Sequence, residues 1–266
     1  MKAQLLLVSI VFGLAGISAC AGQKQKNVSE EKTEDVWKDY PVGYIVFDDQ
    51  APETEGSKVY HRIVTHPQDY IAEQARTVLA TLYDAPSDSI VPVDTIHYSL
   101  QDIEGVSAKD GGNGVVSIFY STRHIEKSFA ANDTAKLFFE TRGVLLHELT
   151  HAYQLEPQGI GSYGTNRVFW AFIEGMADAV RVANGGFTPA DRPKGGNYMD
   201  GYRTAGYFFV WLKDNKDKDF LRKFNRSTLE VVPWSFDGAI KYALGNEYDI
   251  DSLWHEYQVA VGDIQE

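Results

Sequence analysis

The chain of 266 residues is 44% hydrophobic and 13% aromatic, and its formal net charge at pH 7 is −12. This length and composition suit one domain with a substantial core. The acidic balance argues against a nucleic-acid partner and against electrostatic binding to anionic lipid, because both need a basic surface. Nothing in the sequence indicates an oligomer, so we expect a monomer.

Residues 1–19 have the pattern of a secretory signal peptide, in which Lys2 precedes an apolar stretch and small residues. The tetrapeptide ISAC (17–20) resembles a bacterial lipobox, with Ile where Leu is usual. Cys20 is the only cysteine, so the chain cannot form an internal disulfide, and lipidation gives this residue a use. Cleavage near Ala19 without a lipid is the alternative.

We therefore expect an extracytoplasmic lipoprotein that is anchored to a bacterial membrane through Cys20, on the periplasmic or cell-surface face. Removal of residues 1–19 removes one positive charge and no negative one, so the net charge changes from −12 to −13. Residues 20–40 are polar and charged after the cysteine, which predicts a disordered tether. The folded domain is expected to span residues 41–266.

The elements expected in this domain follow one another as strands and then helices, which indicates an α+β fold. Residues 67–83 place apolar side chains at helical spacing behind Pro67. A Gly-rich stretch, 109–114, is expected to be a turn. From about residue 132 onward the sequence is mostly helical. Three stretches have the β-branched and aromatic content of strands: 43–49, 93–100 and 115–122.

The stretch GVLLHELTHAYQLE (143–156) sets polar side chains into an apolar helical pattern. His147 and His151 are four residues apart, so they lie on one face of the helix and can share an ion. With Glu148 they form H-E-x-x-H, in which two imidazoles bind zinc and the glutamate acts as general base. A helix with two satisfied core histidines is the alternative. A catalytic zinc needs a third protein ligand, which distinguishes the two.

The stretch 167–186 predicts a second helix, apolar on nearly every side and ending in glycines. Glu174 and Asp178 lie on one face of it. Two buried carboxylates without partners cost several kcal/mol each, so both need compensation. We expect Glu174 to be the third ligand and Asp178 to accept a hydrogen bond from a ligand histidine. Internal salt bridges are the alternative, with three arginines available: Arg142, Arg167 and Arg181.

H-E-x-x-H followed by Glu174-x-x-x-Asp178 resembles the gluzincin pattern of zinc metallopeptidases. Over about residues 41–260 the chain also resembles the plant and bacterial basic secretory protein family of peptidases. This resemblance implies secretion and a zincin-like fold, with an N-terminal mixed sheet, an active-site helix that carries H-E-x-x-H, and a mostly helical C-terminal part. The acidic charge and the lipobox depart from the family. The matching blocks are 102–121, 142–154, 173–181, 201–212 and 251–258.

The resulting hypothesis is a zinc metallopeptidase that hydrolyses a peptide or protein substrate. Zn²⁺ held by His147, His151 and Glu174 polarises the scissile carbonyl and activates water, while Glu148 transfers the proton to the leaving amine. Two alternatives stay open. One is a non-catalytic binding or adaptor lipoprotein that keeps the zincin fold, and the other is a hydrolase of other amides, such as wall peptides.

Two further expectations concern the substrate. Tyr202 is the first candidate for the donor that stabilises the developing oxyanion, with Tyr198 and Tyr207 behind it. A packed tyrosine with a satisfied hydroxyl is the alternative for each. We also expect strand 115–122 to be the sheet edge along which an extended substrate pairs, with an interior strand as the alternative.

Overall fold

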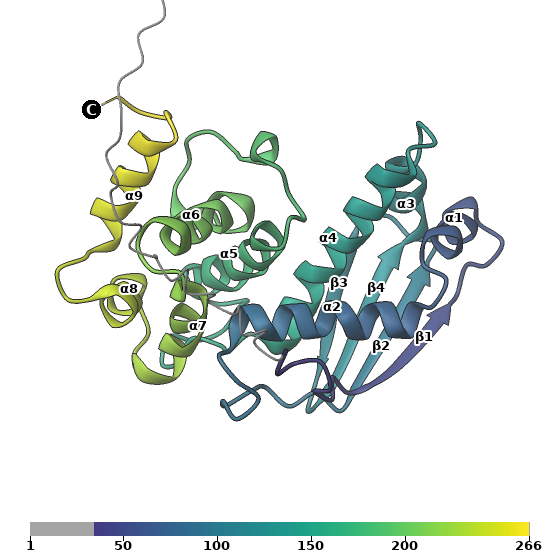
Figure 1. Ribbon diagram of the computed structural model, residues 1–266, viewed down its shortest axis with the longest axis horizontal. Coiled ribbons are helices and arrows are strands. Elements are labelled where there is room, and N and C mark those ends of the chain that lie inside the picture. The colour runs from purple at the N-terminus through teal and green to yellow at the C-terminus, as the bar shows by residue number, and fades with distance from the viewer. Residues whose placement is uncertain (1–34, 266) are drawn as a thin grey trace, which may run out of the picture. The chain divides into compact units, whose positions relative to one another are not determined.

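The computed structural model describes residues 35–265, so the expected signal peptide, Cys20 and most of the tether lie outside the described residues. The predicted α+β class is confirmed (Figure 1). The strands are β1 (Tyr44–Asp49), β2 (Thr95–Gln101), β3 (Ser107–Gly112) and β4 (Val115–Ser121). The helices are α1 (Glu55–Ile63), α2 (Pro67–Leu82), α3 (Thr122–Ser128), α4 (Thr134–Tyr153), α5 (Arg167–Ala183), α6 (Tyr202–Asn215), α7 (Phe220–Glu230), α8 (Phe236–Leu244) and α9 (Ile250–Ala260).

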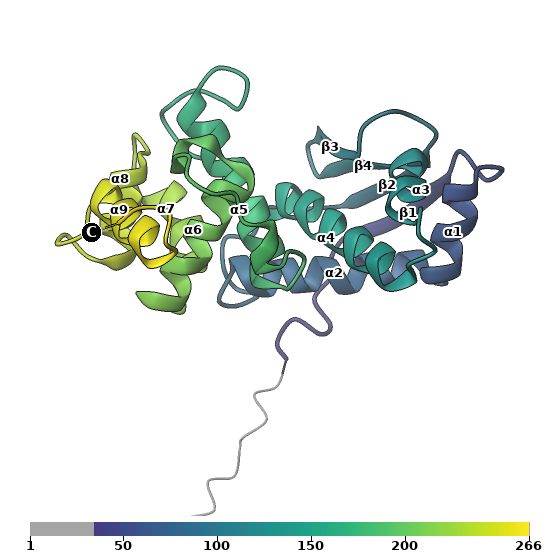
Figure 2. The same cartoon turned by 90° about the horizontal axis from the view of Figure 1, so that it is seen from above.

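The four strands form one mixed sheet in the order β1-β2-β4-β3. β1, β2 and β4 are parallel, while β3 is antiparallel to β4. Alternate residues of β2 are buried, as in Ile96, Tyr98 and Leu100, whereas His97 between them is exposed. This alternation follows from the twofold period of a strand with one covered face. α2 and α4 lie over the covered face (Figure 2).

Two expectations about the strands are wrong. The strand 115–122 is not an edge, because β4 lies between β2 and β3, and β3 forms the edge instead. The stretch 109–114 is not wholly a turn, because its first four residues belong to β3. The turn itself is Asn113-Gly114, with φ values of 52° and 79°. Two positive φ angles are what a tight hairpin turn requires, and Asn-Gly adopts them readily.

α4 joins the two halves of the described chain, since it contacts α2 and β3 on the sheet side and α5 on the helical side (Figure 1). The Asp133 side chain caps its N-terminus by accepting a hydrogen bond from the Lys136 N–H. The predicted helices at 67–83, 167–186 and 201–212 correspond to α2, α5 and α6. α5 is buried over most of its length, so the carboxylates that it carries are held inside the protein.

The packed structure begins within the range expected to be a tether, because Trp37 is only 5% exposed and belongs to the core. Its ring meets Tyr40 edge-on at 5.3 Å between centroids. Within residues 35–265, none of the helices combines the length and the apolar character needed to span a bilayer.

Candidate metal centre

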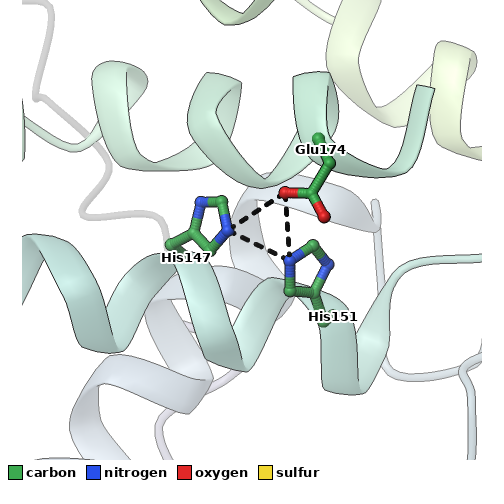
Figure 3. A group of neighbouring side chains, drawn as sticks. All are labelled: His147, His151 and Glu174. Carbon is green, nitrogen blue, oxygen red and sulfur yellow. Dashed lines mark hydrogen bonds and ion pairs between the residues drawn. The ribbon is translucent and has the colours of Figure 1, made fainter. Parts of the chain in front are cut away.

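α4 and α5 bring His147, His151 and Glu174 to one point (Figure 3). The two imidazole Nε2 atoms are 3.1 Å apart, and Glu174 Oε2 is 3.4 Å from that of His147 and 3.7 Å from that of His151. Ligand atoms about 2.1 Å from a tetrahedral ion are separated by about 3.4 Å. The three side chains could therefore hold a metal ion with little movement.

Glu174 supplies the clearest sign that a cation belongs here. The residue is 3% exposed, and its Oε2 atom is buried without a hydrogen-bond partner. The two imidazole nitrogens face this oxygen at distances longer than a good N–H···O bond. The other oxygen, Oε1, accepts a hydrogen bond from the Tyr163 hydroxyl at 2.6 Å. A metal ion would satisfy the unpartnered oxygen, whose burial otherwise costs free energy.

Each imidazole has a hydrogen-bond partner at Nδ1, the ring nitrogen that faces away from the centre. Asp178 Oδ1 lies 2.7 Å from His147 Nδ1, which favours the tautomer with its free lone pair on Nε2. The Gln154 amide lies 2.8 Å from His151 Nδ1, and its Oε1 is buried without a partner. Rotation of this amide by half a turn lets the oxygen accept from Nδ1–H, which leaves His151 Nε2 equally free for a cation.

The charges of the two imidazoles differ. Burial lowers the pKa of His147, but the carboxylates of Asp178 and Glu174 outweigh burial and raise this pKa to about 10. Burial and the neighbouring His147 lower the pKa of His151 to about 3. At neutral pH the extra proton of the pair is therefore on His147, and a binding cation displaces it.

The three residues open onto a cleft of about 730 Å³. α4, α5 and the start of α6 form much of its lining, and the edge strand β3 contributes Ser107, Ala108 and Lys109. Glu148 faces the same cleft although it is only 6% exposed. Burial raises the pKa of Glu148, opposed by the charge of His147 and by the Ser107 side chain. A carboxylate with a raised pKa beside a metal centre is suited to accept a proton.

The salt-bridge alternative does not describe this site. Arg181 pairs with Glu140 at 2.7 Å, and Arg142 donates to the Asn184 carbonyl oxygen at 2.5 Å. Arg167 lies 4.0 Å from Asp200. In the part of the chain that the structure describes, no arginine or lysine is within ion-pair distance of Glu174 or Asp178. Their charges face the two imidazoles instead.

Of the three candidate tyrosines, only Tyr202 reaches the site. Its ring stacks on His147 with 5.9 Å between centroids. Tyr202 has a φ of +40°, a strained value of the kind that clusters at functional sites. Gly201 before it approaches the Trp170 ring so closely that a Cβ would lie 2.8 Å from it. The other two expectations are wrong, because the Tyr198 hydroxyl donates to Asp251 and the Tyr207 hydroxyl to the Thr188 carbonyl oxygen.

The comparison with known families agrees with the geometry. The family model described as peptidase of plants and bacteria (BSP) matches residues 44–257, which include every residue of the centre. The chain belongs to this family. The predicted resemblance is thereby confirmed, and the description of the family supports a peptidase. No curated protein matches the chain.

Tyr163 is the residue of this BSP peptidase that the sequence did not reveal. It lies in the loop between α4 and α5, where no helical or strand spacing links it to the centre. Burial, together with the hydrogen bond to Glu174 and its charge, raises the pKa of the Tyr163 hydroxyl, which stays a hydrogen-bond donor. By binding Oε1 it leaves only Oε2 to face the imidazoles. Tyr163 thus positions the carboxylate for binding through a single oxygen.

Replacement of Tyr163 by phenylalanine is expected to weaken zinc binding by about 10- to 100-fold, the usual effect of losing a partner of a metal ligand. The measurement is competition for zinc against a chelating dye. Tyr44→Phe is the matched control, because Tyr44 is 74% exposed and lies on β1, outside the cleft. Equal zinc affinity of Tyr163→Phe and the unmodified protein would show that Tyr163 does not position Glu174.

Proposed function

We propose that the protein is a zinc-dependent metallopeptidase with a zincin-like fold. The observation that carries the proposal is the buried, unpartnered Oε2 of Glu174 facing the Nε2 atoms of two histidines. Imidazole and carboxylate are ligands that zinc takes in catalytic sites, where three protein ligands leave one position open. His147, His151 and Glu174 would be those ligands.

Zinc, when bound, supplies a Lewis acid that polarises a peptide carbonyl and favours ionisation of water. Glu148 then accepts a proton from the attacking water and gives it to the leaving amine. Its burial favours proton uptake, because it raises the pKa of the carboxylate and makes it a stronger base. Asp178 holds the His147 ring throughout, since its hydrogen bond is made to the nitrogen that faces away from the cation.

Glu148 and the ligand count favour an enzyme over a non-catalytic adaptor. Within residues 35–265, the group that could hold a metal consists of three residues, without a fourth ligand to close it. The acid next to this group opens onto the cleft. An adaptor that uses a structural zinc ion needs neither an open position nor a buried acid beside it.

The edge strand β3 offers a place for an extended substrate. Within residues 35–265 it pairs with β4 alone, so N–H and C=O groups of its outer edge are available for another strand, apart from the Lys109 N–H, which faces Glu148. Val106 to Lys109 line the cleft opposite α4. A peptide that adds to this edge would cross the metal centre with its backbone held by hydrogen bonds. We therefore propose β3, and not the strand at 115–122 that we expected, as the strand to which a substrate adds.

Replacement of Tyr202 by phenylalanine is expected to lower kcat by about 10²- to 10³-fold, the effect of losing one oxyanion donor. Burial, with the charges of Glu174 and Asp178, raises the pKa of Tyr202 to about 12, so the hydroxyl keeps its proton at neutral pH. Zinc affinity should stay within about threefold, since Tyr202 stacks on a ligand without binding zinc. A variant that loses zinc and rate together would identify Tyr202 as a structural support only.

Export and a lipid on Cys20 belong to the same proposal, supported by the sequence of residues 1–20. Mass spectrometry of the protein purified from a bacterial membrane tests for the lipid. We expect Cys20 to be the N-terminal residue and to carry a diacylglyceryl or larger adduct. The enzymatic proposal is tested by zinc content together with cleavage of a broad peptide library. One bound zinc with cleavage supports it, while bound zinc without cleavage of any peptide supports the adaptor.

A further inference from the structure

One end of the cleft carries a guanidinium group that the proposed chemistry does not use. Phe187, Arg181 and Arg203 all line this end. Both guanidinium groups lie over the Phe187 ring, with Cζ of Arg181 at 3.8 Å and Cζ of Arg203 at 5.7 Å from its centroid. Arg181 packs against Gly143, one helical turn before His147 on α4, so this group lies on the His147 side of the metal centre.

The two arginines differ in what their charges do. Arg181 is buried, pairs with Glu140 at 2.7 Å and donates to the Gly186 carbonyl oxygen at 3.0 Å. Arg203 is exposed, and its one hydrogen bond to residues 35–265 is a long one, 3.4 Å, to the Asp191 carbonyl oxygen. The charge of Arg181 is therefore neutralised inside the protein, whereas that of Arg203 faces the cleft.

The carboxylate of Asp191, whose carbonyl oxygen Arg203 contacts, is already engaged. Asp191 Oδ2 accepts hydrogen bonds from the N–H and the hydroxyl of Thr188, both at 2.7 Å, and these lower its pKa. Asp191 reduces the positive potential near Arg203 without forming an ion pair with it in the described part of the chain. A ligand carboxylate could approach Arg203 from the cleft and form the ion pair that Asp191 does not.

The other charges of the cleft do not cancel that of Arg203. Glu174 and Asp178 face the two histidines of the metal centre, and a cation bound there would compensate their charges and that of the neighbouring Glu148. Glu156 lies beyond the C-terminal end of α4 at Tyr153. Arg181 packs against Gly143, which is ten residues before that end of the helix. Ten residues of helix span about 15 Å. Glu156 and the Arg203 end thus lie apart, beyond the about 8 Å over which exposed charges act at physiological ionic strength.

We infer that this end of the cleft is a subsite that binds a carboxylate of the substrate through Arg203, beside the apolar face of Phe187. The inference rests on the proposed peptidase function and specifies its substrate class: peptides with an acidic side chain, or a free C-terminus, a short distance from the scissile bond. A planar guanidinium binds a carboxylate through two hydrogen bonds, and the Phe187 ring, 5.7 Å from Arg203 Cζ, offers an apolar surface beside it. The net charge of −12 does not oppose this, because salt screens distant charges.

The test uses the full chain with zinc and a set of C-terminally amidated peptides that differ only in Glu, Gln or Lys at one position beside the scissile bond. At the peptide position that reaches Arg203, Glu is expected to give a kcat/KM about tenfold higher than Gln. This is the gain expected from one charge-assisted hydrogen-bonded pair. Arg203→Glu is expected to reverse the order, with Lys preferred over Glu. A second arm compares free and amidated C-termini, and a tenfold preference confined to the free acid identifies a terminal carboxylate.

Arg62→Glu is the matched control. Its guanidinium also lies over a phenyl ring, 5.5 Å from the Phe129 centroid, but it is on α1, outside the cleft. This variant should keep the preference for Glu.

Peptide affinities of the Glu148→Gln variant separate the two proposals, because they need no turnover. Absence of cleavage with a Glu-over-Gln preference in Kd contradicts the peptidase and keeps the subsite. Cleavage without any carboxylate preference, in rate or in Kd, overturns the subsite and keeps the peptidase. Peptides that neither bind nor react contradict both.

Discussion

Replacement of Glu148 by glutamine is expected to lower kcat for peptide hydrolysis by about 10³-fold, within the range that general acid–base catalysis supplies. The amide has the same shape but cannot accept the proton of the attacking water. Zinc binding should be preserved, because Glu148 is not one of the three residues that converge. The measurement pairs kcat on a cleaved peptide with zinc content.

Glu156→Gln is the control for this experiment. Glu156 is an exposed carboxylate that lines the same cleft and makes no ion pair within residues 35–265, so its loss removes the same charge without touching the centre. Its kcat should stay within about threefold of the unmodified value. If Glu148→Gln retained full activity, Glu148 could not be the general base.

The second large effect is expected from Glu174→Gln, which should abolish zinc binding at micromolar concentration and peptidase activity together. Zinc at 1,000 times its Kd stabilises a protein by about 4 kcal/mol, which appears as a higher Tm. The unmodified protein should show this rise and Glu174→Gln should not. The zinc-free variant should also lose stability, because Glu174 compensates the charge of the buried His147 in the absence of zinc, so the zinc effect is the rise in Tm of each variant over its own zinc-free value.

Glu140→Gln is the control for the zinc effect. Glu140 is a partly buried carboxylate that pairs with Arg181 at 2.7 Å and lies on α4 away from the two histidines. This variant should lose stability with and without zinc and keep the full rise in Tm on zinc addition. An equal zinc-dependent rise in Tm for Glu174→Gln would exclude Glu174 as a ligand.

The sequence predicts the centre well because helical spacing is a short-range property. His147 and His151 share a face by their separation, as do Glu174 and Asp178, and an apolar surround on α5 indicates burial. That α4 and α5 cross where these faces meet depends on packing between segments, which spacing does not show. Only the hypothesis that the four side chains serve one metal ion predicted that the two helix faces meet, and the distances in the centre agree with it.

The sheet and the loops were less predictable. β3 has the sequence SAKDGG, without a β-branched or aromatic residue, so composition alone does not indicate a strand. The Asn113-Gly114 pair before β4 is a hairpin signal that could have revealed it. Tyr163 has no such signal, because a loop residue reaches its partner only through the folded chain.

An anomalous diffraction experiment at the zinc absorption edge, on crystals of the protein grown with zinc, tests the central claim most directly. We expect one peak about 2.0 to 2.2 Å from His147 Nε2, His151 Nε2 and Glu174 Oε2, with the remaining position open to the cleft beside Glu148. A zinc ion bound elsewhere while this centre stays empty, or a Glu174 side chain turned away from the two imidazoles, would contradict the account.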